Sequence, residues 1–216
     1  RPFFCYLATP AAHTPLFVPE RYRKMYEGVE LPGVAPNQRG EVARFFGMIA
    51  NLEDNMAKLD VFLRETGLRE DTVVVFMTDN GGTNGVRVFN AGMKGSKFSF
   101  FEGGHRVPCF IRWAKGNLSA PGDVEEPTQM QDILPTLLDL CGLKPPEAAK
   151  FDGISLAPRL RGTIDALPDR MLVVNYVNVF TPGPRKEDSA VIWRRWRLVQ
   201  NRALFDLATD PGQASN

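Results

Sequence analysis

Residues 72–82 read TVVVFMTDNGG, an apolar, β-branched run that leads directly into a polar, glycine-rich turn. The run 72–77 shows no polar alternation, which is typical of a strand buried on both faces of a parallel sheet. In open α/β sheets, ligands bind beyond the carboxyl ends of the strands. Asp79 and Asn80 stand at that end, and both offer the hard oxygen ligands that Ca²⁺ and Mg²⁺ prefer. By itself, this turn fits an ordinary Asx-type turn as well as a metal site.

The segments on either side extend this interpretation. Residues 2–8 (PFFCYLA) and 107–113 (VPCFIRW) are apolar runs of strand length, and we expect two more strands there. Apolar residues recur in steps of three and four from about residue 40 to 65, which predicts one long amphipathic helix with Gly67 as its C-cap. This strand–helix–strand order predicts an α/β domain with a mostly parallel sheet flanked by helices.

The pattern changes after Pro168. The runs MLVVNYV, SAVIWRRWRLVQ and ALFDL predict antiparallel strands joined by turns. Alternation of Trp and Arg from Trp193 to Arg197 is typical of a sheet with one wet face. We therefore predict two parts, an α/β domain over 1–167 and a small antiparallel region over 168–216.

Composition limits the classes of partner. The chain of 216 residues carries 26 Lys and Arg against 25 Asp and Glu, a formal net charge of +1. Such a balance produces no global field that would favour nucleic acid, and no apolar run reaches the length of a membrane span. Cys5, Cys109 and Cys141 lie in apolar segments and are expected to be buried small hydrophobes, because their spacing matches no zinc pattern and their number is odd.

Two loops contain further candidates for chemistry. Residues 92–108 read GMKGSKFSFFEGGHRVP and place Lys94 and Lys97 on a glycine-rich loop, where a cation can meet an anionic substrate oxygen. His13 lies in the loop after the first apolar run. By spacing alone, the two lysines are more typical of a solvated surface, and a lone loop histidine is more often a surface or packing residue.

Together, these segments resemble the sulfatase family of the alkaline-phosphatase-like superfamily, in the family's own order and over nearly the whole chain. The resemblance rests on PFFCYLATPAAHTPLFVPERY, TVVVFMTDNGG and GSKFSFFEGGHRVPCFIRW. Later landmarks are QDILPTLLDLCGL, DGISLAPRLRG and ALFDLATDPGQ. It implies an alkaline-phosphatase-like fold and hydrolysis of a sulfate ester, either a small molecule or a sulfated glycan.

The resemblance also implies roles for single residues. Asp79 and Asn80 match two ligands of the family's divalent cation, with Ca²⁺ expected first and Mg²⁺ as the alternative. Lys97 matches the lysine that contacts the substrate sulfate, and His13 matches the histidine that reaches the sulfate or the leaving oxygen. Lys94 is only a basic neighbour. Glu102 and Arg106 match positions of the family's Glu-Gly-Gly-x-Arg-Val-Pro motif, where the resemblance implies a structural role and not a catalytic one.

Three departures from the family pattern matter. Ala12 replaces the proline usual before the histidine, and Phe98 replaces the small residue usual after the lysine. No Cys or Ser stands in a Cys-x-Pro-x-Arg context, where the family forms the formylglycine whose hydrate attacks sulfur. The acidic pair that completes the metal ligands is absent as well. We therefore expect these parts in an N-terminal half outside this sequence, and no activity from the 216 residues alone.

The compartment stays open, with a periplasmic, secreted or lysosome-like location compatible with the resemblance. Two rival functions remain. One is a phosphate- or phosphonate-ester hydrolase of the same superfamily, which the nucleophile would distinguish. The other is a non-catalytic remnant that acts as a binding or structural module.

Overall fold

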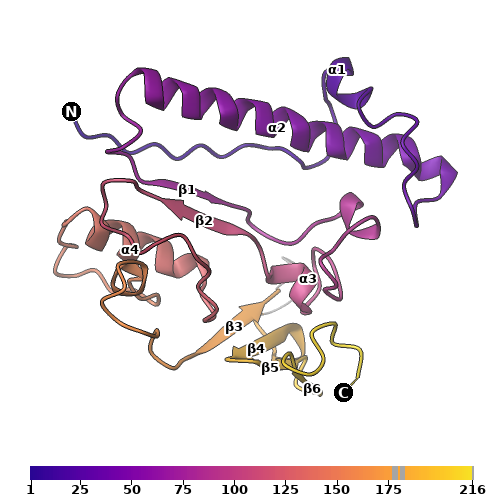
Figure 1. Cartoon of the computed structure of the whole chain (residues 1–216). Coiled ribbons are helices and arrows are strands. Elements are labelled where there is room, and N and C mark those ends of the chain that lie inside the picture. Colours follow the sequence, from indigo (N-terminus) through magenta and orange to yellow (C-terminus); the bar gives the residue numbers. More distant parts are fainter. Residues whose placement is uncertain (177–179, 181–182, 216) are drawn as a thin grey trace. The chain divides into compact units, whose positions relative to one another are not determined.

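A computed structural model describes residues 1–176, 180 and 183–215 of the chain (Figure 1). The chain divides into two units. The first comprises Arg1–Leu68 and Gly82–Ala91, and the second comprises Arg69–Gly81 and Gly92–Asn216. The predicted boundary near residue 168 stays a prediction.

The first unit is built on the long helix α2, which spans Arg39–Glu65 and confirms the helix expected from about residue 40 to 65. Three short elements accompany it: α1 (Glu20–Arg23), η1 (Pro36–Gln38) and η2 (Asn84–Arg87). Gly67 follows the helix with a φ of 72°, and Leu68 N–H donates to the Leu63 carbonyl at 2.8 Å, so Gly67 caps the helix as expected.

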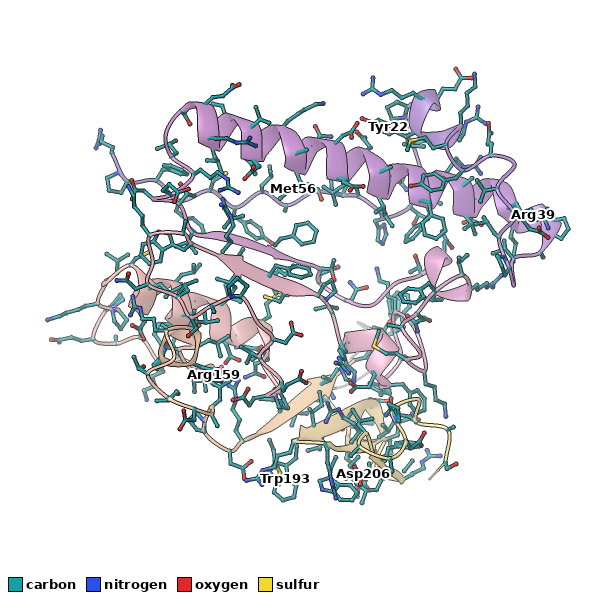
Figure 2. All side chains as sticks on the ribbon, in the orientation of Figure 1. Tyr22, Arg39, Met56, Arg159, Trp193 and Asp206 are labelled. Carbon is teal, nitrogen blue, oxygen red and sulfur yellow. The ribbon has the colours of Figure 1, made fainter. Side chains whose placement is uncertain are left out.

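Helix α1 packs against α2 through close backbone contact (Figure 2). An added Cβ at Gly47 would lie 3.1 Å from the Tyr22 carbonyl group, so the glycine permits the approach. The Tyr22 hydroxyl then donates to Asp54 at 2.7 Å. Leu31, Val34 and Val42 form the buried core of this unit.

The strand predicted over residues 2–8 is wrong for this structure. These residues have no regular secondary structure and are exposed, as are the side chains of Phe4 and Tyr6. A strand requires a neighbour to accept its hydrogen bonds, and no described strand pairs with this run. The prediction of buried cysteines is also wrong, because Cys5, Cys109 and Cys141 are all exposed.

In the second unit, β1 (Val74–Met77) and β2 (Cys109–Arg112) confirm two expected strands. The expected parallel sheet is not found, since all pairings among the described strands are antiparallel. Strand β1 is half-buried, not fully enclosed. Met77 pairs with Cys109, so the loop between the strands begins and ends at the same edge and the chain returns directly along β1.

Residues 130–141 form η3 (Met130–Asp132) followed by α4 (Ile133–Leu140). Pro135 lies in the first turn of α4, where its missing N–H has no helical partner to lose, so the helix does not break there. A short helix, α5 (Ala157–Leu160), follows within residues 152–162.

The antiparallel C-terminal region is confirmed as a four-stranded sheet in the order β3–β4–β5–β6. The strands, with η4 (Lys186–Asp188) before the second, are β3 (Met171–Asn175), β4 (Ser189–Trp193), β5 (Trp196–Val199) and β6 (Ala203–Asp206). At its rim, the Trp193 indole donates to Asp169, and Arg195 pairs with Asp206 (Figure 2). Its core packs against Phe100 and Phe101, which precede α3 (Glu102–His105).

Candidate active site

The two candidate metal ligands directly follow the carboxyl end of β1, as expected. Asp79 is exposed and Asn80 is half-buried, in a bend after the strand. Neither side chain has a hydrogen-bond or ion-pair partner among the described residues, so their oxygens remain available to a ligand. The Asn80 backbone carbonyl accepts a bond of 3.4 Å from the Thr78 hydroxyl, which closes the turn.

The turn is held by backbone contact with helix α3. Gly81 N–H donates to the Gly104 carbonyl at 3.0 Å. A Cβ at Gly81 would lie 1.9 Å from the Gly103 carbonyl oxygen, which is far inside any real contact. Gly81 is therefore required for close approach, and no positive φ is involved.

The turn that carries Lys97 packs against the same helix. Ser99 N–H donates to the Ser96 carbonyl at 2.9 Å, with Lys97 at the centre of this turn. A Cβ at Gly104 would lie 2.1 Å from the Ser99 carbonyl oxygen. The Gly103–Gly104 backbone thus lies between the Asp79–Asn80 turn and the Lys97 turn.

Phe98, which replaces the small residue usual after the lysine, has an unfavourable backbone conformation. Phe98 has a φ of 73°, a left-handed conformation in which a Cβ is unfavourable. A small residue suits this position better. The Phe98 ring lies 5.4 Å from the Tyr176 ring, a packing contact that offsets part of the strain.

Lys94 and Lys97 differ in their contacts with the protein. Lys94 is occupied by protein, since its ammonium donates to the Gln213 carbonyl at 3.0 Å and lies 4.4 Å from the centre of the Phe101 ring. Lys97 is half-buried and forms no ion pair with any described residue; its ammonium lies 5.2 Å from the Phe98 ring. Lys97 is therefore the cation available to an anionic ligand.

Glu102 of helix α3 forms a buried ion pair that was not predicted from the sequence. The side chains of Glu102 and Arg197 are 1% and 10% exposed, and Arg197 Nε donates to Glu102 Oε1 at 2.6 Å. The expected wet-face position of Arg197 is thus wrong, because a buried carboxylate neutralises it. The only sequence signal was the unusual arginine within an otherwise apolar strand.

Burial also affects the neighbouring histidine. Desolvation lowers the pKa of His105 below its ordinary value, and the nearby Arg197 adds to this, although Glu102 opposes it. Its Nε2 atom is buried without a hydrogen-bond partner among the described atoms. His105 is therefore neutral in the folded protein near pH 7.

His13 lies in the first unit, so its convergence with Lys97 and Asp79 stays a prediction. The ring is exposed, and Nδ1 lies 2.7 Å from the Thr14 carbonyl oxygen. Because a carbonyl only accepts, Nδ1 carries the proton in this geometry. The other nitrogen, Nε2, is left for a ligand.

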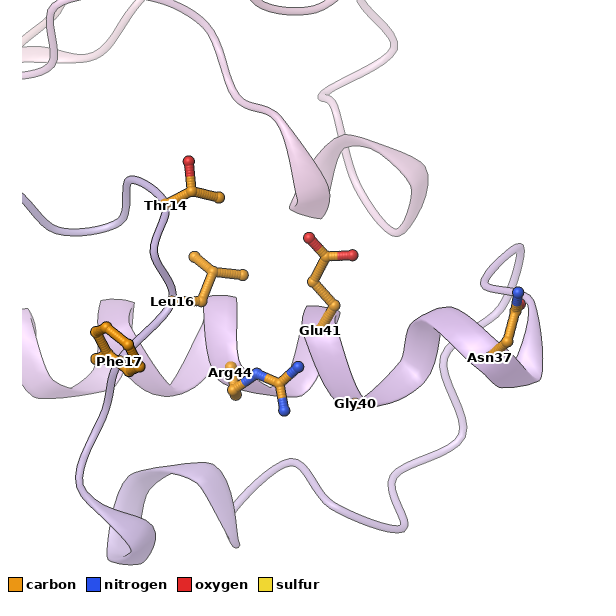
Figure 3. Close-up of a pocket in the computed structure, with 7 residues that line it drawn as sticks. All are labelled: Thr14, Leu16, Phe17, Asn37, Gly40, Glu41 and Arg44. Carbon is orange, nitrogen blue, oxygen red and sulfur yellow. The ribbon is translucent and has the colours of Figure 1, made fainter.

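A pocket of about 530 Å³ is lined in part by Thr14, the residue after His13 (Figure 3). Its lining consists of Thr14, Leu16, Phe17, Asn37, Gly40, Glu41 and Arg44. Glu41 and Arg44 project from the first turns of α2, and Arg44 has no ion-pair partner within the described part of the chain. The pocket thus places the Arg44 cation and the Glu41 carboxylate beside the apolar side chains of Leu16 and Phe17.

The donor chemistry of Asp79 and Asn80 fits a hard divalent cation, since both are oxygen ligands beside one another. The described residues contain no cluster of three or more His, Cys, Asp and Glu side chains that would complete such a site. A cation that prefers six or more oxygens needs further ligands. No described helix combines the length and the apolar character needed to cross a membrane.

Comparison with known proteins places these features in a family. The model of the sulfatase family matches residues 1–143. Steryl-sulfatase of Mus musculus is 27% identical over 99% of this chain, and the match spans 37% of that protein. The crystal structure of Ps i-CgsB aligns with all of this chain at a TM-score of 0.82 and 26% identity, over 46% of its own length.

A phosphonate monoester hydrolase from Silicibacter pomeroyi aligns with 95% of this chain at a TM-score of 0.70 and 22% identity, a likeness of fold alone. These neighbours bear out the alkaline-phosphatase-like fold. The match spans 37% of the steryl-sulfatase, 46% of Ps i-CgsB and 50% of the phosphonate monoester hydrolase, so this chain is at most half as long as each of them.

Proposed function

The chain belongs to the sulfatase family, and we propose that the protein hydrolyses sulfuric esters. One observation carries the proposal beyond family membership. The Asp79–Asn80 turn and the Lys97 turn both pack on the Gly103–Gly104 backbone, which supports a site shared by metal ligands and a free cation. In this proposal Asp79 and Asn80 hold a divalent cation, Ca²⁺ in the first place.

Each residue has a distinct chemical task. The bound cation would polarise the sulfate oxygens as a Lewis acid. Lys97 presents its ammonium to the negative charge that develops on those oxygens. His13 keeps Nδ1–H on the Thr14 carbonyl, so a neutral ring accepts at Nε2, and only the doubly protonated ring donates from Nε2 to the leaving oxygen.

The nucleophile is proposed to come from sequence outside these 216 residues. None of their Cys or Ser residues stands in a Cys-x-Pro-x-Arg context, and the two oxygen ligands are too few for tight metal binding. We therefore expect no turnover from the chain alone. Reading the codons upstream of Arg1 in the same frame tests whether that motif is encoded.

We propose that the pocket beside His13 in the first unit binds a polar part of an ester substrate. Arg44 suits a polar or anionic group, and Phe17 offers an apolar face (Figure 3). A sulfated glycan or a small sulfate ester satisfies both. One similar structure is described as a complex of Ps i-CgsB with k-i-k-neocarrahexaose, which supports a saccharide.

The test is hydrolysis of a chromogenic aryl sulfate by the full-length product with added Ca²⁺, beside the 216-residue chain. Lys97→Ala should lower kcat by about 10²- to 10³-fold, as lost oxyanion donors do. Lys115→Ala is the matched control, because Lys115 is exposed and pairs with Asp71 at 3.1 Å. Faster hydrolysis of an aryl phosphonate would favour the phosphonate-ester alternative, and no turnover of either would favour the non-catalytic module.

A further inference from the structure

The C-terminal sheet is tied to helix α3 by polar contacts to Glu102. Arg197 on β5 donates Nε to the Glu102 carboxylate, and its Nη1 donates to the Arg194 and Trp196 carbonyls at 2.7 and 3.0 Å. These bonds fix the guanidinium from both sides. The backbone N–H of Glu102 donates to Gln213 Oε1 at 2.8 Å. The C-terminal sheet, through Arg197, therefore binds the side chain of Glu102, and the C-terminal tail, through Gln213, binds its backbone.

The tail also holds the lysine loop. Gln213 is fully buried, and its carbonyl accepts the Lys94 ammonium. The Lys94 carbonyl in turn accepts the Gly103 N–H at 2.8 Å. These contacts link Gln213 to the start of the loop and to α3 at once.

The two glycines of α3 contact the turns of the candidate site. Gly103 and Gly104 follow Glu102 directly, and the Asp79–Asn80 turn and the Lys97 turn rest on them with no room for a Cβ. Interiors packed this closely transmit a displacement and do not absorb it. A shift of Glu102 must therefore move the two turns.

We propose that Arg197 and Gln213 are positioning residues for the candidate site, so that the C-terminal sheet sets the placement of Asp79, Asn80 and Lys97. Neither residue touches substrate; both act through Glu102. The inference rests on the proposed function only for what the two turns do, and the contacts themselves are independent of it. Without Arg197 the buried Glu102 carboxylate keeps, among the described residues, only the exposed Arg106, whose Nη1 lies 3.6 Å from its Oε2. Most of its charge compensation is then lost, so the helix must shift to reach water.

The decisive measurement is amide hydrogen exchange in the intact protein without metal. In Arg197→Met, exchange at the Gly81 and Gly103 amides should rise about tenfold or more, as expected for loss of a supporting hydrogen bond, while amides within α4 keep their wild-type rates. Arg194→Met is the matched control, because Arg194 lies in the same hairpin, loses the same charge and pairs with Asp169 at the exposed rim. Wild-type exchange at Gly81 and Gly103, or an equal rise in α4, would overturn the proposal.

Two variants separate positioning from stability. Glu102→Met with Arg197→Met removes the buried charge, so it keeps the protein folded even where Arg197→Met alone unfolds, yet faster exchange at Gly81 should persist. Gln213→Asn shortens the reach of the side-chain oxygen that accepts from Glu102 N–H. Faster exchange at Gly103 in Gln213→Asn supports the proposal, and unchanged exchange there removes Gln213 from it.

Metal binding provides the second arm. In the full-length protein, Ca²⁺ affinity measured by calorimetry should fall about 10- to 100-fold in Arg197→Met, the effect typical of lost outer-shell partners, and stay unchanged in Arg194→Met. A wild-type protein that binds no Ca²⁺ and cleaves no aryl sulfate would refute the proposed function. The exchange result would still decide whether Arg197 and Gln213 position the two turns.

Discussion

Substitution of Gly81 by alanine tests the geometry of the candidate site most directly. The added Cβ would lie 1.9 Å from the Gly103 carbonyl oxygen and 3.0 Å from the Gly104 Cα. Both are backbone atoms, so no side chain can rotate away. To reach even a 3.0 Å separation, the two backbones must move apart by about 1.1 Å, which also weakens the 3.0 Å bond from Gly81 N–H to Gly104.

The expected loss follows from this displacement. Asp79 and Asn80 directly precede Gly81, so a shift of about 1 Å moves these candidate metal ligands relative to Lys97. Misplacement by about 1 Å costs on the order of 10²-fold in rate, which corresponds to about 2.7 kcal/mol of transition-state stabilisation. We expect Gly81→Ala to lower kcat/KM by about that factor and to weaken Ca²⁺ binding in parallel.

The assay is aryl sulfate hydrolysis by the full-length protein, with Ca²⁺ affinity by calorimetry and melting temperature on the same samples. Gly122→Ala is the matched control, because its added Cβ lies no closer than 3.8 Å to any other atom and its φ is not positive. A folded Gly81→Ala protein with wild-type kcat/KM and Ca²⁺ affinity would show that the turn and α3 are not rigidly coupled.

Two further predictions concern stability. Burial lowers the pKa of His105, so the unfolded chain binds a proton before the folded protein does as pH falls below about 6.5, and the free energy of unfolding then declines by at most about 1.4 kcal/mol per pH unit. We expect His105→Gln to make the melting temperature depend less on pH between pH 7.5 and 5.5. The same pH dependence in the variant and in the wild-type protein would contradict this. Asp132 is fully buried, and burial alone would raise its pKa, but hydrogen bonds from Arg170, Ile154 N–H and Gln129 N–H keep that pKa low. We expect Asp132→Asn to lower the free energy of unfolding, measured by urea titration, by about 3–5 kcal/mol. A loss below about 1 kcal/mol would refute a stabilising role for the Asp132–Arg170 pair.

Local pattern was enough to predict much of this architecture. The helix α2 was predictable because its period and its terminal glycine are properties of consecutive residues. The Asp79–Asn80 turn after β1 was predictable because an apolar run followed by Asp-Asn-Gly-Gly has few other structures. The antiparallel hairpins after residue 168 were predictable for the same reason.

Pairing partners and distant contacts were not predictable in this way. A continuous apolar run fits either strand direction, so the antiparallel return of β2 along β1 had to be observed. The run 2–8 has the composition of a strand but finds no partner among the described strands. Arg197 was read as a wet-face residue because nothing near it in sequence reveals a carboxylate at Glu102.

The antiparallel return has a consequence for the site itself. A parallel third strand would force the loop after Asn80 to cross the length of the sheet, and only the beginning of the loop would lie near the candidate metal ligands. Because Met77 pairs with Cys109, both ends of the loop lie at one edge. The whole glycine-rich segment can then fold back on that edge, which is where Gly103 and Gly104 meet Gly81. The antiparallel return thus agrees with the proposed role of Lys97, because the part of the loop that carries Lys97 belongs to the same unit as Asp79 and Asn80.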